Sequence, residues 1–317
     1  MSKEIYLKIA EQNQENLPIF YQPWWLDIVC GKDNWGAAVY GDSIQKPKGV
    51  WPYYIVRKFG AIWMMSPVLT PFLGPYVFYP KQEQKPESKL SYEKKVLSHL
   101  ADSLPKSQVI KVKTPPSLEN WLPLYWKGFR QTTNYTYQTK MSEELDLLDE
   151  YTTAVRSDIK KVVDGLTIEK TSDASIVYDL SASSYQKQGD EIYFDRETFL
   201  KLDKRLAADN TRTMLVARRS DGTAIAAVYV FYSNGTAYLP IIGRGNLERD
   251  EKTVVKKLLH EAIKQSSNQA KIFDFEGSMV LQFEKVFRSF GSKQIPYHVL
   301  SRTHGLMGKV IRLKWNI

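Results

Sequence analysis

Hydrophobic and polar positions along the chain predict an alternation of short strands and amphipathic helices. In the second half, the apolar run Ala224–Tyr232 is followed by Asn234-Gly235 and by a second run, Ala237–Ile242. Asn-Gly favours the tight turn of a β-hairpin, because both of its central residues need a positive φ. The first half contains a similar strand, turn and strand, at 49–56, 58–60 and 61–65.

The segments after these two hairpins predict an internal repeat. Ser91–Leu100 and Thr253–Ala262 each begin with a helix-capping residue type and carry apolar residues at helical spacing. A short strand, a second helix and a closing strand follow in each half, at 109–113, 118–129 and 135–137 and again at 271–275, 280–290 and 297–299. Equivalent positions such as Lys94 and Lys256 stay about 162 residues apart. We therefore predict two copies of one α/β unit, each with a mixed sheet.

Further helices are predicted around the two copies. One begins the first copy at 23–29, and two precede the second copy, at 184–188 and 194–208. Between the copies, Ser142 to about Asp164 predicts a single bridging helix. Its expected apolar stripe consists of Leu145, Leu148, Val155, Ile159 and Val162.

Composition narrows the classes of protein without naming a function. The 317 residues are 43% hydrophobic, and the net charge is +9. Basic residues are spread along the sequence, so they suit either a phosphate-bearing partner or an ordinary lysine-rich surface. Cys30 is the only cysteine, which excludes an internal disulfide and suits a reducing compartment. With no apolar window of spanning length and no signal-like start, we expect a cytoplasmic protein without a transmembrane segment.

Three parts of the sequence resemble the Fem (FemABX) peptidyltransferases and the related BioF2-like acetyltransferase domains. They are Asp146-Leu-Leu followed by Arg156–Lys161, then Tyr185–Gly189, and then Phe273–Ser278 followed by Phe287–Gly291. The resemblance covers about half of the chain. It implies two tandem GNAT-like acyltransferase domains, which we expect at 1–140 and 141–301, with 302–317 returning to complete the first.

The resemblance also implies an activity, the transfer of an acyl or aminoacyl group to an amine. In Fem proteins the donor is aminoacyl-tRNA and the acceptor a peptidoglycan precursor, whereas ordinary GNAT enzymes use acetyl-CoA. The expected partners are an amine-bearing small molecule or envelope precursor, and tRNA, with no tightly bound cofactor. Two alternatives stay open: an acyl-CoA-dependent N-acyltransferase, and a non-catalytic scaffold that binds RNA or an envelope-precursor assembly.

The sequence departs from both families at two places. A CoA-binding unit holds the pyrophosphate with glycines at the turn into its central helix. Here Gly243 and Gly245 lie well before the helix expected at Thr253, and Asp250 and Glu251 would repel phosphates. The equivalent stretch of the first copy, 81–90, has no glycine. The catalytic lysine of Fem proteins is also replaced, by Phe287 or Arg288.

Two residues are the candidates for catalysis. Glu276 follows a strand end, where α/β sheets commonly bind ligands, and it could accept the proton of the attacking amine. Its alternative role is to cap the next helix together with Ser278. Arg288 could hold a phosphate or stabilise an oxyanion, although it cannot lose a proton.

Six residues are candidates for substrate binding. Arg156 and Lys160 share a helix face and could bind phosphates, or they are ordinary surface charges. Tyr193 lies in a loop-like stretch, and Trp25 could line an acceptor cleft unless it belongs to the core. Gln186 and Ser278, which lie in the family-like segments, complete the set. No metal-binding spacing is present in the sequence.

Overall fold

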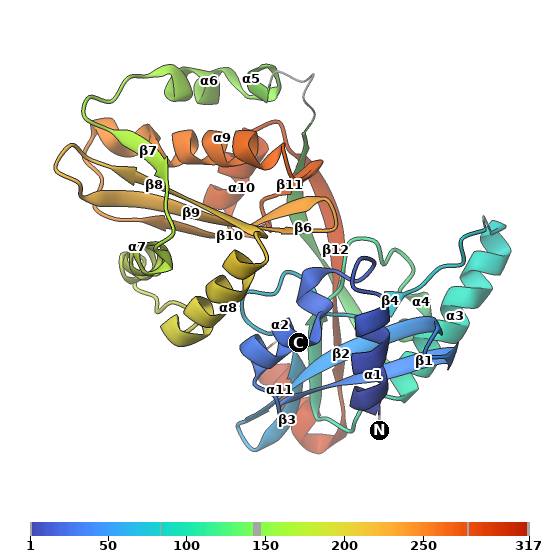
Figure 1. The fold of residues 1–317 in the computed structure, drawn as a ribbon. Coiled ribbons are helices and arrows are strands. Elements are labelled where there is room, and N and C mark those ends of the chain that lie inside the picture. The colour runs from blue at the N-terminus through green and yellow to red at the C-terminus, as the bar shows by residue number, and fades with distance from the viewer. Residues whose placement is uncertain (1, 83, 142–146, 278, 316–317) are drawn as a thin grey trace. The chain divides into compact units, whose positions relative to one another are not determined.

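A computed structural model describes residues 2–82, 84–141, 147–277 and 279–315 (Figure 1). The chain forms two compact units. Unit 1 comprises Met1–Asn134 and Pro296–Ile317, and unit 2 comprises Tyr135–Ile295. The boundaries fall inside two strands, β6 (Arg130–Lys140) and β12 (Lys293–Thr303). The tandem-domain bounds 1–140 and 141–301 stay a prediction.

Unit 1 is built on a sheet with the strand order β1-β2-β3-β5-β12, in which β4 pairs with β2. Side chains alternate between its faces: Ala38 and Trp51 pack with α3, whereas α1 contacts β1 from the other side. The strands are β1 (Trp35–Ser43), β2 (Lys46–Lys58), β3 (Ala61–Met65), β4 (Tyr76–Val77) and β5 (Val109–Lys113). The helices are α1 (Ser2–Gln12), η1 (Ile19–Tyr21), α2 (Pro23–Cys30), α3 (Pro86–Asp102), α4 (Leu122–Tyr125) and α11 (Gly305–Trp315).

Unit 2 is built on a sheet with the order β6-β11-β10-β9-β8-β7. One face is covered by α7 and α8 and the other by α9 and α10, and α6 lies over α9 (Figure 1). The strands are β7 (Thr167–Lys170), β8 (Arg212–Arg218), β9 (Ala224–Ser233), β10 (Thr236–Arg244) and β11 (Ile272–Asp274). The helices are α5 (Leu147–Glu150), α6 (Thr153–Lys160), α7 (Ala174–Gln186), α8 (Arg196–Ala208), η2 (Asp250–Thr253), α9 (Val254–Ser266) and α10 (Leu281–Arg288). The prediction of α/β units with mixed sheets is confirmed, and the turn at Asn234-Gly235 has the expected positive φ angles of 47° and 72°.

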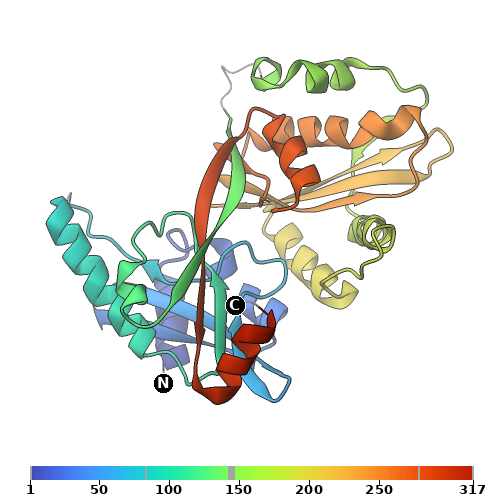
Figure 2. The same cartoon turned by 180° about the vertical axis from the view of Figure 1, so that it is seen from behind.

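The two closing strands are exchanged between the halves of the sequence, which the repeat did not predict. β6 follows the elements of unit 1 in the chain, yet its residues Gln138–Lys140 pair with β11 of unit 2. Residues Val299–Thr303 of β12 pair with β5 of unit 1 (Figure 2). Each unit is therefore completed by a strand from the other half of the chain.

The single bridging helix expected from Ser142 to Asp164 is not formed. Its described part consists of two short helices, α5 and α6, which are separated at Tyr151. The Tyr151 ring is buried against Phe290, and the Thr152 amide donates to the Ser289 carbonyl at 3.0 Å. These tertiary contacts replace the helical hydrogen bonds at the break. Val162, expected in the apolar stripe, is 87% exposed, and Leu145 lies outside the described residues.

Candidate functional site

Strands β10 and β11 of unit 2 separate after a short parallel pairing. They pair over three positions, from Thr236 with Ile272 to Tyr238 with Asp274. The register of β10 against β9 then shifts between Tyr238 and Ile241, at a bulge that contains Pro240. A bulge bends its strand, and proline has no N–H to donate to a neighbouring strand. β10 continues to Arg244, whereas β11 ends.

A tight turn at the end of β11 determines the position of Glu276. Glu276 and Gly277 both have left-handed backbones, with φ angles of 56° and 62°. The Glu276 amide donates to Asp274 Oδ1 at 2.7 Å. A Cβ atom on Gly277 would lie 2.1 Å from the Tyr135 carbonyl oxygen, so only glycine fits there. The sequence Glu-Gly thus fixes Glu276, which is half-buried, just beyond the strand end.

Asp274 supports this turn from inside unit 2, and the sequence interpretation did not single it out. Its side chain is fully buried and accepts hydrogen bonds from Thr136 Oγ1, from Gln138 Nε2 at 2.8 Å and from the Glu276 amide. Burial raises the pKa of the Asp274 carboxyl, and the three donors partly oppose that rise. The signal that could have identified Asp274 from the sequence is its position as an acidic residue between two phenylalanines, at the end of a short apolar strand.

The raised pKa of Asp274 predicts how stability depends on pH. A carboxyl group whose pKa is higher in the folded state stabilises the fold fully below its unfolded pKa, about 3.9 for aspartate. That contribution is lost as the pH rises through the folded-state pKa. We expect the wild type to lose unfolding free energy, relative to Asp274→Asn, as the pH rises above about 4. Urea unfolding of both proteins across the pH range measures this difference, and parallel curves would contradict it.

Tyr193, a second predicted site residue, lies within electrostatic reach of Glu276. The Tyr193 ring packs between Tyr185 and Phe194, with centroids 6.0 and 5.0 Å away, and is half-exposed. The pKa of its hydroxyl is raised, first because protein atoms displace water around the hydroxyl and second because the Glu276 carboxylate is close. The hydroxyl therefore keeps its proton and can donate a hydrogen bond. Gln186 ends α7 nearby in sequence, with its side chain exposed.

Beyond the bulge, β10 no longer pairs with β11, and some of its backbone N–H and C=O groups point toward the side where β11 paired with it. Arg244 donates its amide to Ser184 Oγ at 2.8 Å, whereas the Gly245 amide donates to Ile225 beside β9. Successive residues of a strand direct their N–H and C=O groups to opposite sides. Ile242 therefore directs its backbone groups to the same side as Arg244, away from β9. An N–H in this position can donate to a carbonyl or oxyanion oxygen.

The segment that a CoA pyrophosphate would require has structural roles here. A Cβ on Gly243 would lie 2.7 Å from the Ser181 amide nitrogen, so this glycine lets β10 approach α7. Near the start of α9, Glu251 is buried and receives two hydrogen bonds from Arg219, at 2.6 and 2.8 Å. The Arg219 hydrogen bonds are the main reason that the pKa of Glu251 is lowered, so the carboxylate stays ionised in its pair with Arg219. Both residues of this segment therefore have structural contacts within unit 2.

The corresponding part of unit 1 is occupied by the chain itself. β3 and β5 pair in parallel from Trp63 with Val109 to Met65 with Lys111, as β10 and β11 do. The segment after β3 then returns along β5: the Leu73 amide donates to the Lys113 carbonyl at 2.9 Å. Side chains of this segment, Leu69, Thr70, Phe72 and Leu73, are all buried. In unit 1 this segment therefore covers the strand edge that is equivalent to the β10 edge of unit 2.

Other predicted site residues lie elsewhere. Arg288 is the last residue of α10 and lies roughly 10 Å along the helix axis from the first residue of that helix. Its side chain is 65% exposed and forms a 2.9 Å ion pair with Glu284. Trp25 is fully buried, with its indole N–H donating to Thr70 Oγ1 at 3.0 Å. It lies in the core of unit 1 rather than on a surface, because its ring fills the space beside Phe20. Ser278 lies outside the described residues.

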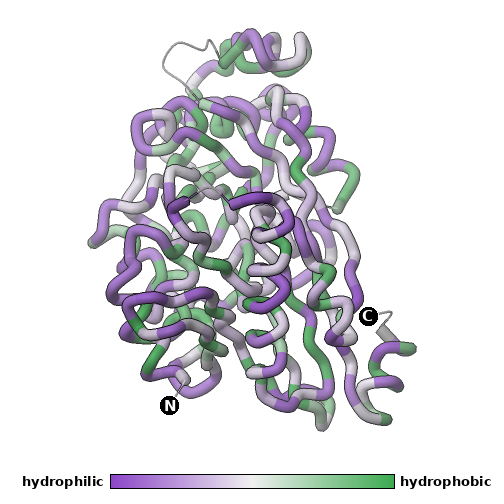
Figure 3. The backbone as a smooth tube through the Cα atoms, turned by 90° about the vertical axis from the view of Figure 1, so that its right-hand side faces the viewer, coloured by the Kyte–Doolittle hydropathy of each residue, from purple (hydrophilic) through white to green (hydrophobic). Residues whose placement is uncertain are grey.

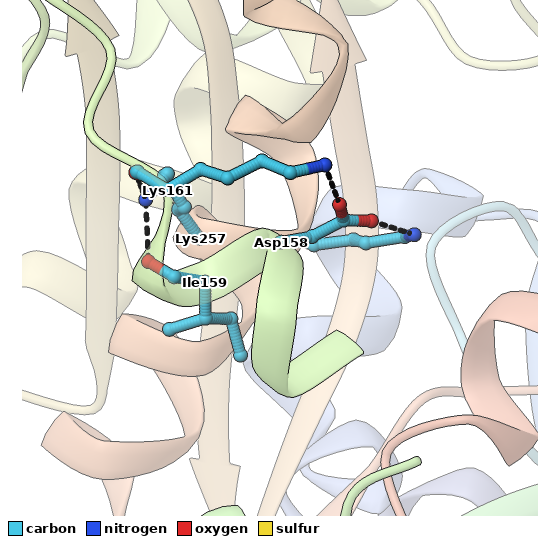
Figure 4. A network of polar contacts seen from close by, with 5 residues as sticks. Asp158, Ile159, Lys161 and Lys257 are labelled. Carbon is cyan, nitrogen blue, oxygen red and sulfur yellow. Dashed lines mark hydrogen bonds and ion pairs between the residues drawn. The ribbon is translucent and has the colours of Figure 1, made fainter. Parts of the chain in front are cut away.

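Arg156 and Lys160 share the outer surface of α6, as the i, i+4 spacing predicted. The helix is fastened to α9 at its C-terminal end: Lys257 Nζ donates to the carbonyls of Ile159 and Lys161, and Asp158 pairs with Lys161 at 2.7 Å (Figure 4). The Lys257 ammonium stabilises the C-terminal end of α6, because the helix dipole is negative there. Arg156 and Lys160 line a shallow surface depression, and within the described ranges neither forms an ion pair.

Comparisons with known proteins rest on the fold. No protein-family model matches the sequence, and no curated protein matches it. Among solved structures, FemX superposes with a TM-score of 0.62 at 10% identity, covering 99% of this chain and 98% of FemX. L-PGS from Bacillus licheniformis gives 0.53 at 11% identity, covering 98% and 95% of the two chains. A tandem GNAT protein from the clavulanic acid biosynthesis pathway gives 0.53 at 10%, covering 96% and 95%. The chain therefore has the fold of the Fem-like double-GNAT proteins, which confirms the resemblance at the level of structure.

No helix in the described ranges is both long and apolar enough to cross a bilayer. Among the same residues, no group of three or more His, Cys, Asp or Glu side chains is arranged to hold a metal ion.

Proposed function

We propose that this protein transfers an acyl or aminoacyl group to an amine, at the β10–β11 separation of unit 2. The observation that carries the proposal is the Asp274–Gly277 turn, which holds a half-buried carboxylate beside a tyrosine at a strand end. The double-GNAT fold supports the same class of reaction. Unit 1, whose equivalent edge is covered, is proposed to have a binding or structural role.

In the proposed reaction the amine nitrogen attacks the acyl carbon. The new C–N bond forms as the carbonyl oxygen becomes an oxyanion, which accepts a hydrogen bond from the Ile242 N–H. Glu276 takes the proton that the amine loses, and Tyr193 donates a hydrogen bond within the site. The bond to the leaving group then breaks, and the leaving oxygen or sulfur receives the proton that Glu276 took from the amine. Arg288 has no part in this scheme, because its side chain is paired on the surface of α10.

For the donor we propose an aminoacyl-tRNA rather than an acyl-CoA. Buried Glu251, paired with the partly exposed Arg219, lies near the start of α9, where a CoA pyrophosphate would need backbone amide donors. Lys187 and Arg244 are two cations close to each other. Desolvation is the main cause of the lowered pKa of Lys187, and the charge of the Arg244 guanidinium lowers that pKa further. Arg156 and Lys160 offer two more cations in the same unit. The acceptor is proposed to be an amine on a small molecule or an envelope precursor, and the reaction is expected in the cytoplasm.

Ligand binding distinguishes the two donors. A ligand that binds only the native state stabilises it by about 2.7 kcal/mol at a hundredfold excess over Kd. We expect thermal unfolding to shift upward with charged tRNA and not with acetyl-CoA, and we expect amide formation from the aminoacyl donor. Lys187→Met should weaken tRNA binding, whereas Lys204→Met, an exposed lysine on α8, should not. Stabilisation by acetyl-CoA would contradict the donor, and salt-dependent RNA binding without transfer from either donor would favour the scaffold.

A further inference from the structure

The outer face of α11 in unit 1 carries apolar side chains in solvent. Leu306, Val310 and Leu313 are 83%, 64% and 82% exposed, and their spacing brings them onto one side of the helix. The opposite side holds the helix to the sheet, where buried Ile311 packs with Ala61, Trp63 and Val109. Large apolar side chains exposed in a row are unusual on a soluble surface and indicate a binding face.

Basic residues flank this apolar row. Helical spacing puts Lys309 on one side of it and Lys314 on the other. Hydrophobic and hydrophilic residues alternate along α11, the last coloured coil before the C-terminal label in Figure 3. A helix with an apolar stripe and flanking lysines suits the boundary between acyl chains and anionic headgroups, because its cations reach the headgroups while its apolar stripe is buried.

The turn between β2 and β3 extends the same surface. A Cβ on Gly60 would lie 4.0 Å from Met307 Cε, so this turn lies beside the first turn of α11 (Figure 2). Phe59, at the tip, is 63% exposed, and Lys58 lies 5.4 Å from its ring centroid. The turn therefore repeats the composition of α11, an exposed apolar side chain next to a cation.

Three arginines meet in a small cavity at the base of this surface. Arg130, Arg302 and Arg312 line about 50 Å³, together with Gly128, Ser301 and Thr303. The Arg302 guanidinium lies 4.4 Å from the Phe129 ring centroid, and burial lowers its pKa. Within the described part of the chain none of the three arginines forms an ion pair. The Asp102 carboxylate is close enough to affect the pKa of Arg302, but it forms its ion pair with Lys127, at 2.6 Å. A cavity of this size admits one phosphoryl group and excludes a nucleotide, since drug-sized ligands fill about 300 Å³ or more.

We infer that this face of unit 1, formed by α11, the β2–β3 turn and the arginine cavity, docks onto an anionic lipid bilayer. The apolar row enters the acyl-chain boundary, the lysines contact anionic headgroups, and the cavity takes one lipid phosphate. The positive charge of the face favours a negatively charged partner, and its apolar row favours acyl chains. An anionic bilayer provides both. The inference does not depend on the transfer chemistry proposed for unit 2.

Vesicle co-sedimentation of the full chain tests this inference. We expect binding to vesicles of phosphatidylcholine and phosphatidylglycerol in equal parts, weak binding to phosphatidylcholine alone, and a loss of binding as salt screens the charges. The double variant Leu306→Glu with Leu313→Glu should reduce partitioning at least about tenfold. Leu90→Glu, at a 54% exposed leucine on α3, is the matched control and should bind as the wild type does.

A second pair of variants tests the cavity. Arg130→Ala and Arg312→Ala should each weaken binding about fivefold, as expected for one cation at a charged membrane surface. Thermal unfolding and the transfer activity of unit 2 should not change in either protein. Equal binding to both vesicle types, or full binding by the double leucine variant, would overturn the proposal. A dimer in solution that the double leucine variant breaks, without vesicle binding, would overturn it in favour of a second copy.

Discussion

Replacing Glu276 with glutamine is expected to lower the transfer rate about a hundredfold to ten-thousandfold, the usual contribution of a positioned general base. The amide of glutamine has the size of the carboxylate but cannot accept the proton of the attacking amine. The turn itself should survive, because the substitution keeps the backbone N–H of residue 276 that donates to Asp274. Steady-state kinetics should therefore show a fall in kcat without a change in the unfolding midpoint.

Two further variants make the Glu276 result specific. Glu191→Gln removes an exposed carboxylate from the loop that carries Tyr193, and it should leave the rate unchanged within about twofold. Tyr193→Phe keeps the ring packing and removes the hydroxyl, so it should slow transfer less than Glu276→Gln does. The wild-type rate should also fall on the acid side of its pH profile, and the glutamine variant should lose that dependence. Full activity of Glu276→Gln would move the site elsewhere while leaving the class of reaction intact.

Replacing Gly277 with alanine is expected to destabilise unit 2 by about 4 kcal/mol, a large effect for one methyl group. The new Cβ would lie 2.1 Å from the Tyr135 carbonyl oxygen and 2.6 Å from Thr136 Cα. Both contacts are backbone atoms, so no side chain can rotate away. The left-handed φ of 62° adds a further cost of about 1–2 kcal/mol for any residue with a Cβ.

Gly189 provides the control for this effect. It also has a left-handed backbone, with a φ of 77°, but a Cβ added there would meet nothing within 4 Å. Gly189→Ala should therefore cost about 1 kcal/mol, the conformational part alone. Urea unfolding of the two variants separates the steric clash from the backbone preference. Similar costs at both glycines would mean that the strand ends near Tyr135 can move apart, and that the position of Glu276 is not rigid.

Local patterns in the sequence determined most of the elements and selected one candidate site residue. The Asn234-Gly235 turn and the apolar runs beside it predicted the β9–β10 hairpin, because turn chemistry and strand periodicity depend on neighbouring residues only. The amphipathic spacing after Thr253 predicted α9 for the same reason. Glu276 could be selected from its place after a short strand. The repeat and the family-like segments then predicted the double-GNAT architecture, which the structure bears out.

Only the tertiary structure decided which strands pair and what surrounds the site. The exchange of β6 and β12 joins residues far apart in the sequence, such as Phe273 with Thr139, and no local period encodes such a pairing. The same contacts bury Asp274, set Gly277 against Tyr135 and interrupt the expected bridging helix at Tyr151. Sequence alone thus determined that the chain would form α/β units with a carboxylate at a strand end. Long-range packing decided that the equivalent strand edge of unit 1 is covered by the chain itself, through the buried segment that follows β3.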